Sequence, residues 1–284
     1  MARLRSISAA ALTGAAVLAV SPTIAGEVTP ERLVDADREP QNWLMNHRTY
    51  DAQRYSPLGK INKANVKNLK LAYALAIGGA AANENLQSTP LAEDGFLYVV
   101  DQWGVVYKVD VRSGDIARIV WRMDPGQEKL PLSNRGAALW GNLVLSTANY
   151  PARVIATNKD NGKVVWETNL HDQPDVQLTA AVLPVKDKII VGAANGDTGV
   201  RDWIAGLDAK TGKRLWRQFT IPAPGEPGSE TWKDKNNAWQ TGGGAVWVPA
   251  PMIRPPTRPS GAPAIRCRCS TRPTAPAIIS TPTA

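Results

Sequence analysis

Cysteine is scarce in this chain of 284 residues: the sequence holds two, Cys267 and Cys269, both near the C-terminus. The body of the chain therefore uses no disulfide. Two neighbouring cysteines also make a poor metal site, because structural zinc normally needs a second pair of ligands nearby. The sequence thus argues against a disulfide-stabilised scaffold and against a zinc module.

The body of the chain also lacks a surplus of positive charge, even though the formal net charge of the whole sequence is +8. Residues 1–25 hold two arginines, residues 248–284 hold five, and neither stretch holds an acid. The residues between them hold 26 basic and 25 acidic side chains. Proteins that bind nucleic acid carry a basic patch or stripe, so we expect no nucleic-acid partner.

The apolar run near the N-terminus is too short for a membrane span. The stretch from about Ala9 to Val20 is near 12 residues, whereas a transmembrane helix needs about 20. Two arginines precede it and small residues close it at Thr23–Ala25, which is the pattern of a secretory signal peptide. We expect residues 1–25 to be a signal peptide and the mature protein to begin near Gly26, with no membrane span; an uncleaved anchor is the alternative.

A sequence motif that occurs three times is the most informative feature of the chain. Each copy has a short apolar run, an Asp or Asn, a Gly four residues later, and a second run that carries a Trp. Asp or Asn opens a turn by bonding its own backbone, and Gly supplies the positive φ that other residues resist. The three copies are Asp110–Gly114, Asn158–Gly162 and Asp208–Gly212, and they lead to Trp121, Trp166 and Trp216.

The spacing of these copies predicts a radial β architecture. Their glycines are 48 and 50 residues apart, and a strand repeat of this length is typical of a β-propeller. One such sheet cannot cover its own faces, so neighbouring sheets must stack, and a Trp in that contact buries roughly 150–250 Å². We predict an all-β fold: a β-propeller of four-stranded antiparallel blades docked through the repeated Trp, with about four blades in residues 26–247. A β-sandwich with coincidental spacing is the alternative.

Longer motifs make the chain resemble the pyrroloquinoline quinone (PQQ) dependent alcohol dehydrogenases. They run in order from about residue 30 to 247: Asn42–Leu58, Ile61–Leu69, Thr89–Gly95, Asn134–Gly136, Gly199–Arg201 and Trp239–Trp247. The resemblance implies that residues 26–247 are part of an eight-bladed propeller with PQQ on its axis and a bound calcium ion. It also implies oxidation of a small-molecule alcohol in the periplasm, with electrons passed to a cytochrome c or a quinone acceptor.

The resemblance assigns four residues to the cofactor. Trp247 matches the tryptophan on which the quinone ring stacks, and indole offers the largest flat face. Arg135 matches the arginine that faces the quinone oxygens and polarises them with its permanent charge. Thr179 matches a hydroxyl that binds a PQQ carboxylate, and Gln87 stands where many relatives have a Glu at the cofactor rim. Core packing for Trp247, a surface ion pair for Arg135 and an ordinary strand position for Thr179 are the alternatives.

Asp197 is the residue that the resemblance assigns to the metal. Its loop, Ala194–Arg201, matches the segment that gives a Glu to calcium, and carboxylate oxygens suit this hard cation. Asp is one methylene shorter than Glu, so either the loop moves in or another ion fits; a plain turn residue is the alternative. The chain departs from many relatives at Lys129 and Leu130, which stand where those relatives carry adjacent, disulfide-bonded cysteines.

Two other functions stay open at this point. A non-catalytic propeller scaffold in the cell envelope has the same Trp-bearing blades, and a small four-bladed binding module is a third possibility. Gln87, Arg135, Thr179 and Trp247 discriminate against a scaffold, which has no reason to direct them at an axis.

The character of the sequence changes after residue 247. Residues 248–284 hold nine of the 22 prolines, no aromatic residue, no acid and no strand pattern, which indicates a disordered Pro/Arg-rich tail. We also hypothesise that this tail is read out of frame. Codons for Pro263–Ala277 can be chosen so that a shifted frame spells the next stretch of the family, including a Gly-Asn-Pro whose Asn binds calcium. Coding DNA whose third bases cannot spell that stretch contradicts the hypothesis.

The resemblance places the catalytic Asp base and a second calcium ligand beyond residue 248, so we assign no catalytic residue in this chain. We expect the purified chain, supplied with PQQ and Ca²⁺, to be inactive because no base draws the proton from the alcohol. The measurement is alcohol-dependent reduction of a redox dye. A rate above that of PQQ and Ca²⁺ alone contradicts the expectation.

Overall fold

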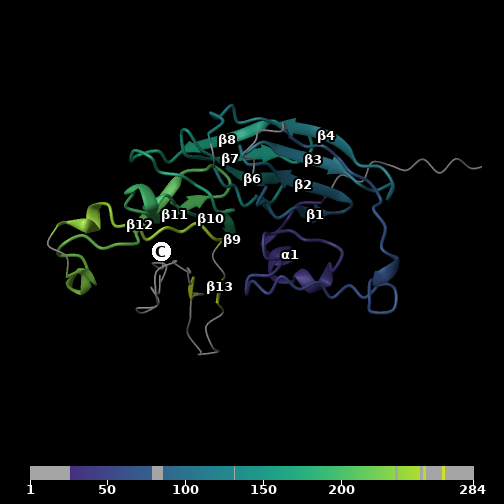
Figure 1. Ribbon diagram of the computed structural model, residues 1–284, viewed down its shortest axis with the longest axis horizontal. Coiled ribbons are helices and arrows are strands. Elements are labelled where there is room, and N and C mark those ends of the chain that lie inside the picture. The colour runs from purple at the N-terminus through teal and green to yellow at the C-terminus, as the bar shows by residue number, and fades with distance from the viewer. Residues whose placement is uncertain are drawn as a thin grey trace, which may run out of the picture.

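The computed structural model describes residues 26–78, 86–130, 132–233 and 236–249, and the backbone of two short strands in the tail. The fold is built on three four-stranded antiparallel sheets, in each of which neighbouring strands are consecutive in the sequence. Figure 1 shows the sheets side by side, in chain order. The predicted all-β propeller architecture is confirmed, with three complete blades in the described residues where about four were expected. The signal peptide predicted for residues 1–25 lies outside the described residues.

Each blade runs from an inner strand to an outer one. The first consists of β1 (Leu91–Glu93), β2 (Phe96–Val100), β3 (Val106–Asp110) and β4 (Arg118–Met123). The second consists of β5 (Ala138–Trp140), β6 (Leu143–Ala148), β7 (Arg153–Asn158) and β8 (Val164–Asn169). The third consists of β9 (Leu183–Val185), β10 (Lys188–Gly192), β11 (Trp203–Asp208) and β12 (Arg214–Phe219).

The remaining elements are short. One α-helix, α1 (Pro30–Val34), precedes the blades, and its start is capped by the Thr29 hydroxyl, which accepts from the N–H of Arg32 at 3.4 Å. Five 3₁₀ turns are η1 (Ala36–Arg38), η2 (Val66–Asn68), η3 (Gly196–Thr198), η4 (Ser229–Thr231) and η5 (Ala238–Gln240). Of residues 248–284, predicted to lack strands, four pair as β13 (Met252–Ile253) and β14 (Ala264–Ile265).

The repeated turns have the chemistry that the sequence predicted. In the third blade, Oδ1 of Asp208 accepts from the N–H groups of Lys210 and Thr211, at 3.1 and 2.8 Å, and so closes the turn between β11 and β12. Gly212 then takes a φ of +73°, in the left-handed region that favours glycine. The equivalent glycines, Gly114 and Gly162, have φ of +81° and +73°.

The Trp side chains of the first two blades each pack on a glycine of the next blade. Trp121 on β4 lies against Gly162 of the second blade, where an added Cβ would come within 2.9 Å of the indole. Trp166 on β8 lies in the same way against Gly212 of the third blade, at 2.5 Å. The indole nitrogen of Trp121 also donates to the carbonyl of Lys159 at 2.9 Å. Gly162 and Gly212 therefore have two roles: each takes the positive φ of its turn, and each leaves room for the Trp side chain of the preceding blade.

The three Trp residues occupy corresponding positions of successive outer strands. Each is paired with the neighbouring strand, and in each strand the register shifts directly before the Trp. The shift leaves one extra residue unpaired, which is a β-bulge. The bulged residues are Val120, Val165 and Leu215, and all three are exposed.

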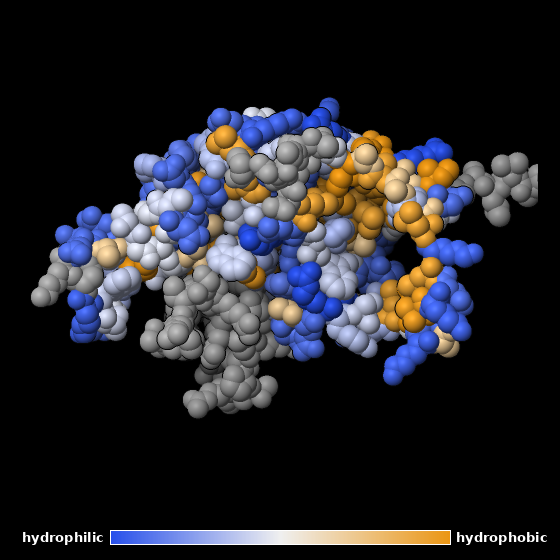
Figure 2. Space-filling view, in the orientation of Figure 1, coloured by the Kyte–Doolittle hydropathy of each residue, from blue (hydrophilic) through white to orange (hydrophobic). Residues whose placement is uncertain are grey.

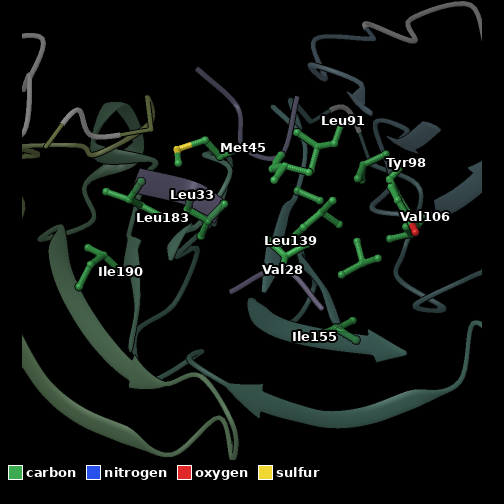
Figure 3. Close-up of a cluster of buried hydrophobic side chains, with 14 of the residues drawn as sticks. Val28, Leu33, Met45, Leu91, Tyr98, Val106, Leu139, Ile155, Leu183 and Ile190 are labelled. Atoms are coloured by element: carbon green, nitrogen blue, oxygen red, sulfur yellow. The ribbon is translucent and has the colours of Figure 1, made fainter. Parts of the chain in front are cut away.

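The N-terminal lead covers the inner edges of the blades and shares their core. Val28 forms a bridge with Gly141 at the second blade, and Trp43 forms one with Ala92 in β1. Leu33 is buried in one apolar cluster with residues of all three blades. Figure 3 shows these side chains from the lead and the three sheets turned toward one another; those labelled are Val28, Leu33, Met45, Leu91, Tyr98, Val106, Leu139, Ile155, Leu183 and Ile190.

A buried ionic network ties the lead to the first two blades. Glu93 and Lys159 are both 0% exposed, and their charged atoms approach to 2.7 Å. Arg32 of α1 adds a second contact to Glu93 at 2.9 Å, and the Lys159 ammonium also donates to the carbonyl of Gly26 at 3.0 Å. Because both charges are withdrawn from water, the removal of Glu93 leaves the Lys159 ammonium without a counter-charge, which typically costs about 3–5 kcal/mol. The removal of Lys159 still leaves Glu93 paired with Arg32.

Beyond the lead, the chain leaves the blades and runs over the surface. Residues 53–72 are exposed throughout, and they include several large apolar side chains: Tyr55, Leu58, Ile61, Val66, Leu69 and Leu71. Figure 2 shows apolar patches on the side of the molecule where this segment lies. Leu75 and Ile77 then return to pack on β3. No helix within the described ranges has the length and apolar character needed to cross a membrane.

The docking contact can be isolated by comparing two glycines. In Gly212→Ala, the positive φ costs about 1 kcal/mol, and the collision with Trp166 adds roughly 1–3 kcal/mol. In Gly114→Ala only the first cost applies, because an added Cβ there meets nothing within 4 Å. The free energies of unfolding, from urea titrations of both variants and the parent, measure the difference. Equal costs at the two positions contradict the docking role of Gly212.

Candidate cofactor site

The segments that begin the three blades meet at one end of the sheets, and backbone hydrogen bonds join them in a row. The N–H of Thr89, before β1, donates to the carbonyl of Arg135, before β5, at 3.4 Å. The N–H of Arg135 in turn donates to the carbonyl of Thr179, before β9, at 3.1 Å. Each blade thus fixes the position at which the inner strand of the next blade starts.

Trp247 reaches this end from the segment after η5. The N–H of Val246 donates to the carbonyl of Ala193, directly after β10, at 2.8 Å. The Val246 side chain also lies over Gly192, where a Cβ would overlap it. These contacts hold the backbone beside Trp247, while the indole itself stays 37% exposed. A large aromatic surface is therefore presented on an anchored segment.

Arg135 lies over this indole. Its Cζ is 4.7 Å from the ring centroid of Trp247, a cation–π contact, and its Nη1 donates to the carbonyl of Thr179 at 3.3 Å. Burial lowers the pKa of Arg135 below its usual value. Among the described residues, none of the ion pairs includes this guanidinium. The site thus holds a partly desolvated cation that an anionic ligand would neutralise.

The hydroxyl of Thr179 lies at the same end of the blades and is unsatisfied. The residue is buried, and its Oγ1 has no hydrogen-bond partner in the described part of the chain. Buried polar atoms are normally paired, so this hydroxyl fits a ligand that brings its own oxygen. Three of the four residues predicted for the cofactor, Arg135, Thr179 and Trp247, are therefore brought together.

Gln87, the fourth residue predicted for the cofactor, is brought to the same end by the backbone. It follows Leu86, which forms a parallel bridge with Asn134, the residue before Arg135. Its side chain is exposed. Gln87 therefore lies next to the same row of blade starts, exposed to solvent.

The loop between β10 and β11 carries Asp197 to this end as well. Ala194 and Gln177 exchange backbone hydrogen bonds of 2.8 and 3.4 Å. Gly196 approaches Gly243 so closely that an added Cβ would lie 2.5 Å from the Gly243 Cα. Only glycine fits this approach, which holds the loop against the segment after η5. Asp197, within η3, has an exposed side chain beside this contact.

Sequence reasoning missed Asp202, which ends the same loop. The residue is 0% exposed, and neither carboxylate oxygen has a hydrogen-bond partner among the described residues. Burial, and after it the carboxylate of Asp197, raise the pKa of Asp202 to about 7. The N–H of Gly196 opposes this shift but does not complete a hydrogen bond. The available signal was an acid placed directly before the apolar run Trp203–Leu207.

The carboxylates of this part of the chain supply only part of a metal's ligands. Within the described ranges, no three or more His, Cys, Asp or Glu side chains gather into a group suited to a metal ion. Asp197 and Asp202 are two carboxylates of one loop. A hard cation bound beside them would complete its oxygen shell from other groups.

Comparisons with known proteins point to one family. Residues 43–252 match the family model described as glucose/ethanol/alcohol dehydrogenase, β-propeller domain, with PQQ. A curated relative, the dehydrogenase subunit of alcohol dehydrogenase (quinone) from Gluconacetobacter polyoxogenes, is 34% identical over 273 residues; the match covers 85% of this chain and 35% of that protein. Quinohemoprotein alcohol dehydrogenase ADH-IIG of Pseudomonas putida is 32% identical, with coverage of 86% and 36%.

Solved structures show the same similarity. The structure of ADH-IIG from Pseudomonas putida superimposes with a TM-score of 0.70 at 29% identity, over 86% of this chain and 37% of that one. A europium-containing methanol dehydrogenase gives a TM-score of 0.68 at 27% identity, over 76% and 41%. The chain spans about a third of the length of the curated relatives named here.

Proposed function

We propose that this chain, which belongs to the PQQ-dependent glucose/ethanol/alcohol dehydrogenase β-propeller family, supplies the cofactor-binding part of a quinoprotein alcohol dehydrogenase. The observation that carries the proposal is the convergence of Arg135, Thr179 and Trp247 at one end of the blades. They come from three segments far apart in the sequence; the Thr179 hydroxyl has no partner, and Arg135 is partly desolvated without a counter-charge among the described residues.

The chemistry of PQQ fits these residues. The cofactor is a flat, electron-poor quinone that carries carboxylates, so it needs an aromatic face, a cation and hydrogen-bond donors. Trp247 offers the face, Arg135 the cation and Thr179 a hydroxyl donor. The guanidinium covers one side of the indole in the present arrangement, so the quinone takes the other side or shifts Arg135 to the ring edge. We assign to Gln87 a hydrogen bond to the rim of the cofactor through its amide.

When bound, the cofactor accepts the two electrons that leave an alcohol as it becomes a carbonyl compound. The residues of this chain position the cofactor and polarise it. Arg135 places permanent positive charge where negative charge develops, and its partial burial leaves that charge less screened than it would be in open water. Thr179 fixes the orientation of the ring through a carboxylate. Asp197 holds the cation, for which we propose calcium, at the cofactor.

The proposal extends to the cellular compartment of the reaction and to its electron acceptor. We propose a periplasmic protein, because residues 1–25 have the pattern of a signal peptide. The electrons go to a cytochrome c or a quinone, and one relative is itself named an alcohol dehydrogenase (quinone). Because the chain spans about a third of such relatives, the alcohol and the acceptor are proposals for the whole enzyme.

A scaffold role explains the blades but not the site. A structural propeller gains nothing from an unpaired arginine and a buried, unpartnered hydroxyl at the axis end, since each costs free energy when left unsatisfied. A cofactor that satisfies both accounts for them.

PQQ binding by the full chain tests the proposal through tryptophan fluorescence. We expect PQQ to quench the emission, with a smaller signal in Trp247→Phe. Arg135→Met should weaken binding about 10- to 100-fold, since a hydrogen bond to a charged group contributes roughly 1.5–3 kcal/mol. Trp140→Phe is the control. Trp140 lies at the end of β5 that is away from the site, and its indole donates to the carbonyl of Lys186. Unchanged emission at millimolar PQQ, or equal affinity of Arg135→Met and the parent, refutes the cofactor site.

A further inference from the structure

Asp202 is a buried carboxylate with no partner. It lies between the exposed loop that carries Asp197 and the start of β11, and it is 0% exposed. Both of its oxygens lack a hydrogen-bond partner in the described part of the chain, although an ionised carboxylate has room for several donors. Withdrawal of an ionised carboxylate from water is strongly unfavourable unless a proton or a cation neutralises it.

The direction of this side chain is set by the backbone. The N–H of Asp202 donates to the carbonyl of Gly243 at 3.3 Å, and its carbonyl accepts from the N–H and hydroxyl of Thr220 at 3.0 and 2.9 Å. One carboxylate oxygen, Oδ2, then lies 2.7 Å from where a Cβ on Gly196 would stand. The carboxylate is thus directed at the residue next to Asp197, and a side chain on Gly196 would displace it.

The basic side chain adjacent to Asp202 in the sequence is committed elsewhere. Arg201 precedes Asp202, but its Nε and Nη2 donate to the carbonyl of Ile221 at 3.0 and 2.7 Å. Its guanidinium also lies on the rings of Phe219 and Trp239, with Cζ 3.9 and 4.9 Å from their centroids. No ion pair of the described residues includes Asp202. The neutralising charge is therefore not a side chain of this part of the protein.

We propose that Asp202 is the second carboxylate of a cation site on the β10–β11 loop, in which Asp197 supplies the first. The ion is a hard cation that prefers oxygen ligands, of charge two or three. The inference rests on the proposed function for the role of Asp197 and goes beyond it for Asp202. The added carboxylate compensates for the short reach of Asp197, since two acids on one loop attract the ion more strongly than one.

The opposing account gives Asp202 a structural role as a neutral, protonated acid. That account predicts that the affinity for a cation does not depend on Asp202. A measurement of cation affinity therefore distinguishes the two accounts, and it does not require the chain to be catalytically active.

The test is Tb³⁺ binding to the full chain, followed by terbium luminescence on excitation of tryptophan and repeated as competition by Ca²⁺. We expect Asp202→Asn and Asp197→Asn each to weaken Tb³⁺ binding at least 10-fold. Asp187→Asn is the matched control: Asp187 is an exposed acid paired with Lys188, and its removal should leave the affinity unchanged. Asp202→Ala serves as a second variant, because a buried Asn amide brings unpaired donors of its own.

Thermal unfolding supplies an independent readout. We expect Ca²⁺ or Tb³⁺ to raise the midpoint of the parent chain and of Asp187→Asn, and to leave that of Asp202→Asn and Asp202→Ala unchanged. Parent-like affinity and a parent-like rise in either Asp202 variant overturn the proposal in favour of the neutral structural acid. A parent chain that binds PQQ but neither cation also overturns it while the cofactor site stands. A chain that binds the cation through both acids but does not bind PQQ refutes the proposed function and leaves this site in place.

Discussion

The packing of an indole from one blade against a turn glycine of the next blade is the constraint on which the rest of this structure depends. A single four-stranded sheet with apolar middle strands cannot cover its own faces. Trp121 on Gly162 and Trp166 on Gly212 join each sheet to the next at the same point of the repeat. Because the bulge before each Trp is also repeated, successive blades are presented to their neighbours by the same device. The angle between blades is thereby set by side-chain packing rather than by the connecting loops.

The site is a result of this regular stacking. Thr89, Arg135 and Thr179 stand at the start of successive blades, so docking at the outer strands aligns them at the inner end, where their backbones join. Polar groups that would be poor choices in an isolated sheet, such as the Thr179 hydroxyl and the Asp202 carboxylate, are gathered there without partners. Buried polar atoms without partners occur elsewhere in the described blades too, for example at Ser146 and Thr157, so their meaning at this end depends on the neighbouring Arg135 and Trp247.

Much of this fold could be predicted because its turns and docking residues are local in sequence. Asp208 and Gly212 act within one turn, so their pattern is visible without a structure. Arg135, Thr179 and Trp247 were found through the family resemblance, and their meeting could not be derived from spacing, since it depends on how three segments stack. Asp202 and Lys159 were missed for the same reason. Lys159 has the appearance of an ordinary turn lysine, and only the approach of Glu93 from another blade explains its burial.

The ion pair of Glu93 and Lys159 also has a consequence for the order of assembly. Its partners are 66 residues apart in the chain, and Gly26 and Arg32 close around them from the N-terminal lead. A contact between distant segments forms only after the loop between them has been brought together. The earliest part of the body to be synthesised therefore gains its final anchorage only when the second blade exists. Until then Gly26 of the lead lacks its contact with Lys159, and Arg32 meets the carboxylate of Glu93 without that lysine, so the lead is among the last described parts of the chain to become fixed.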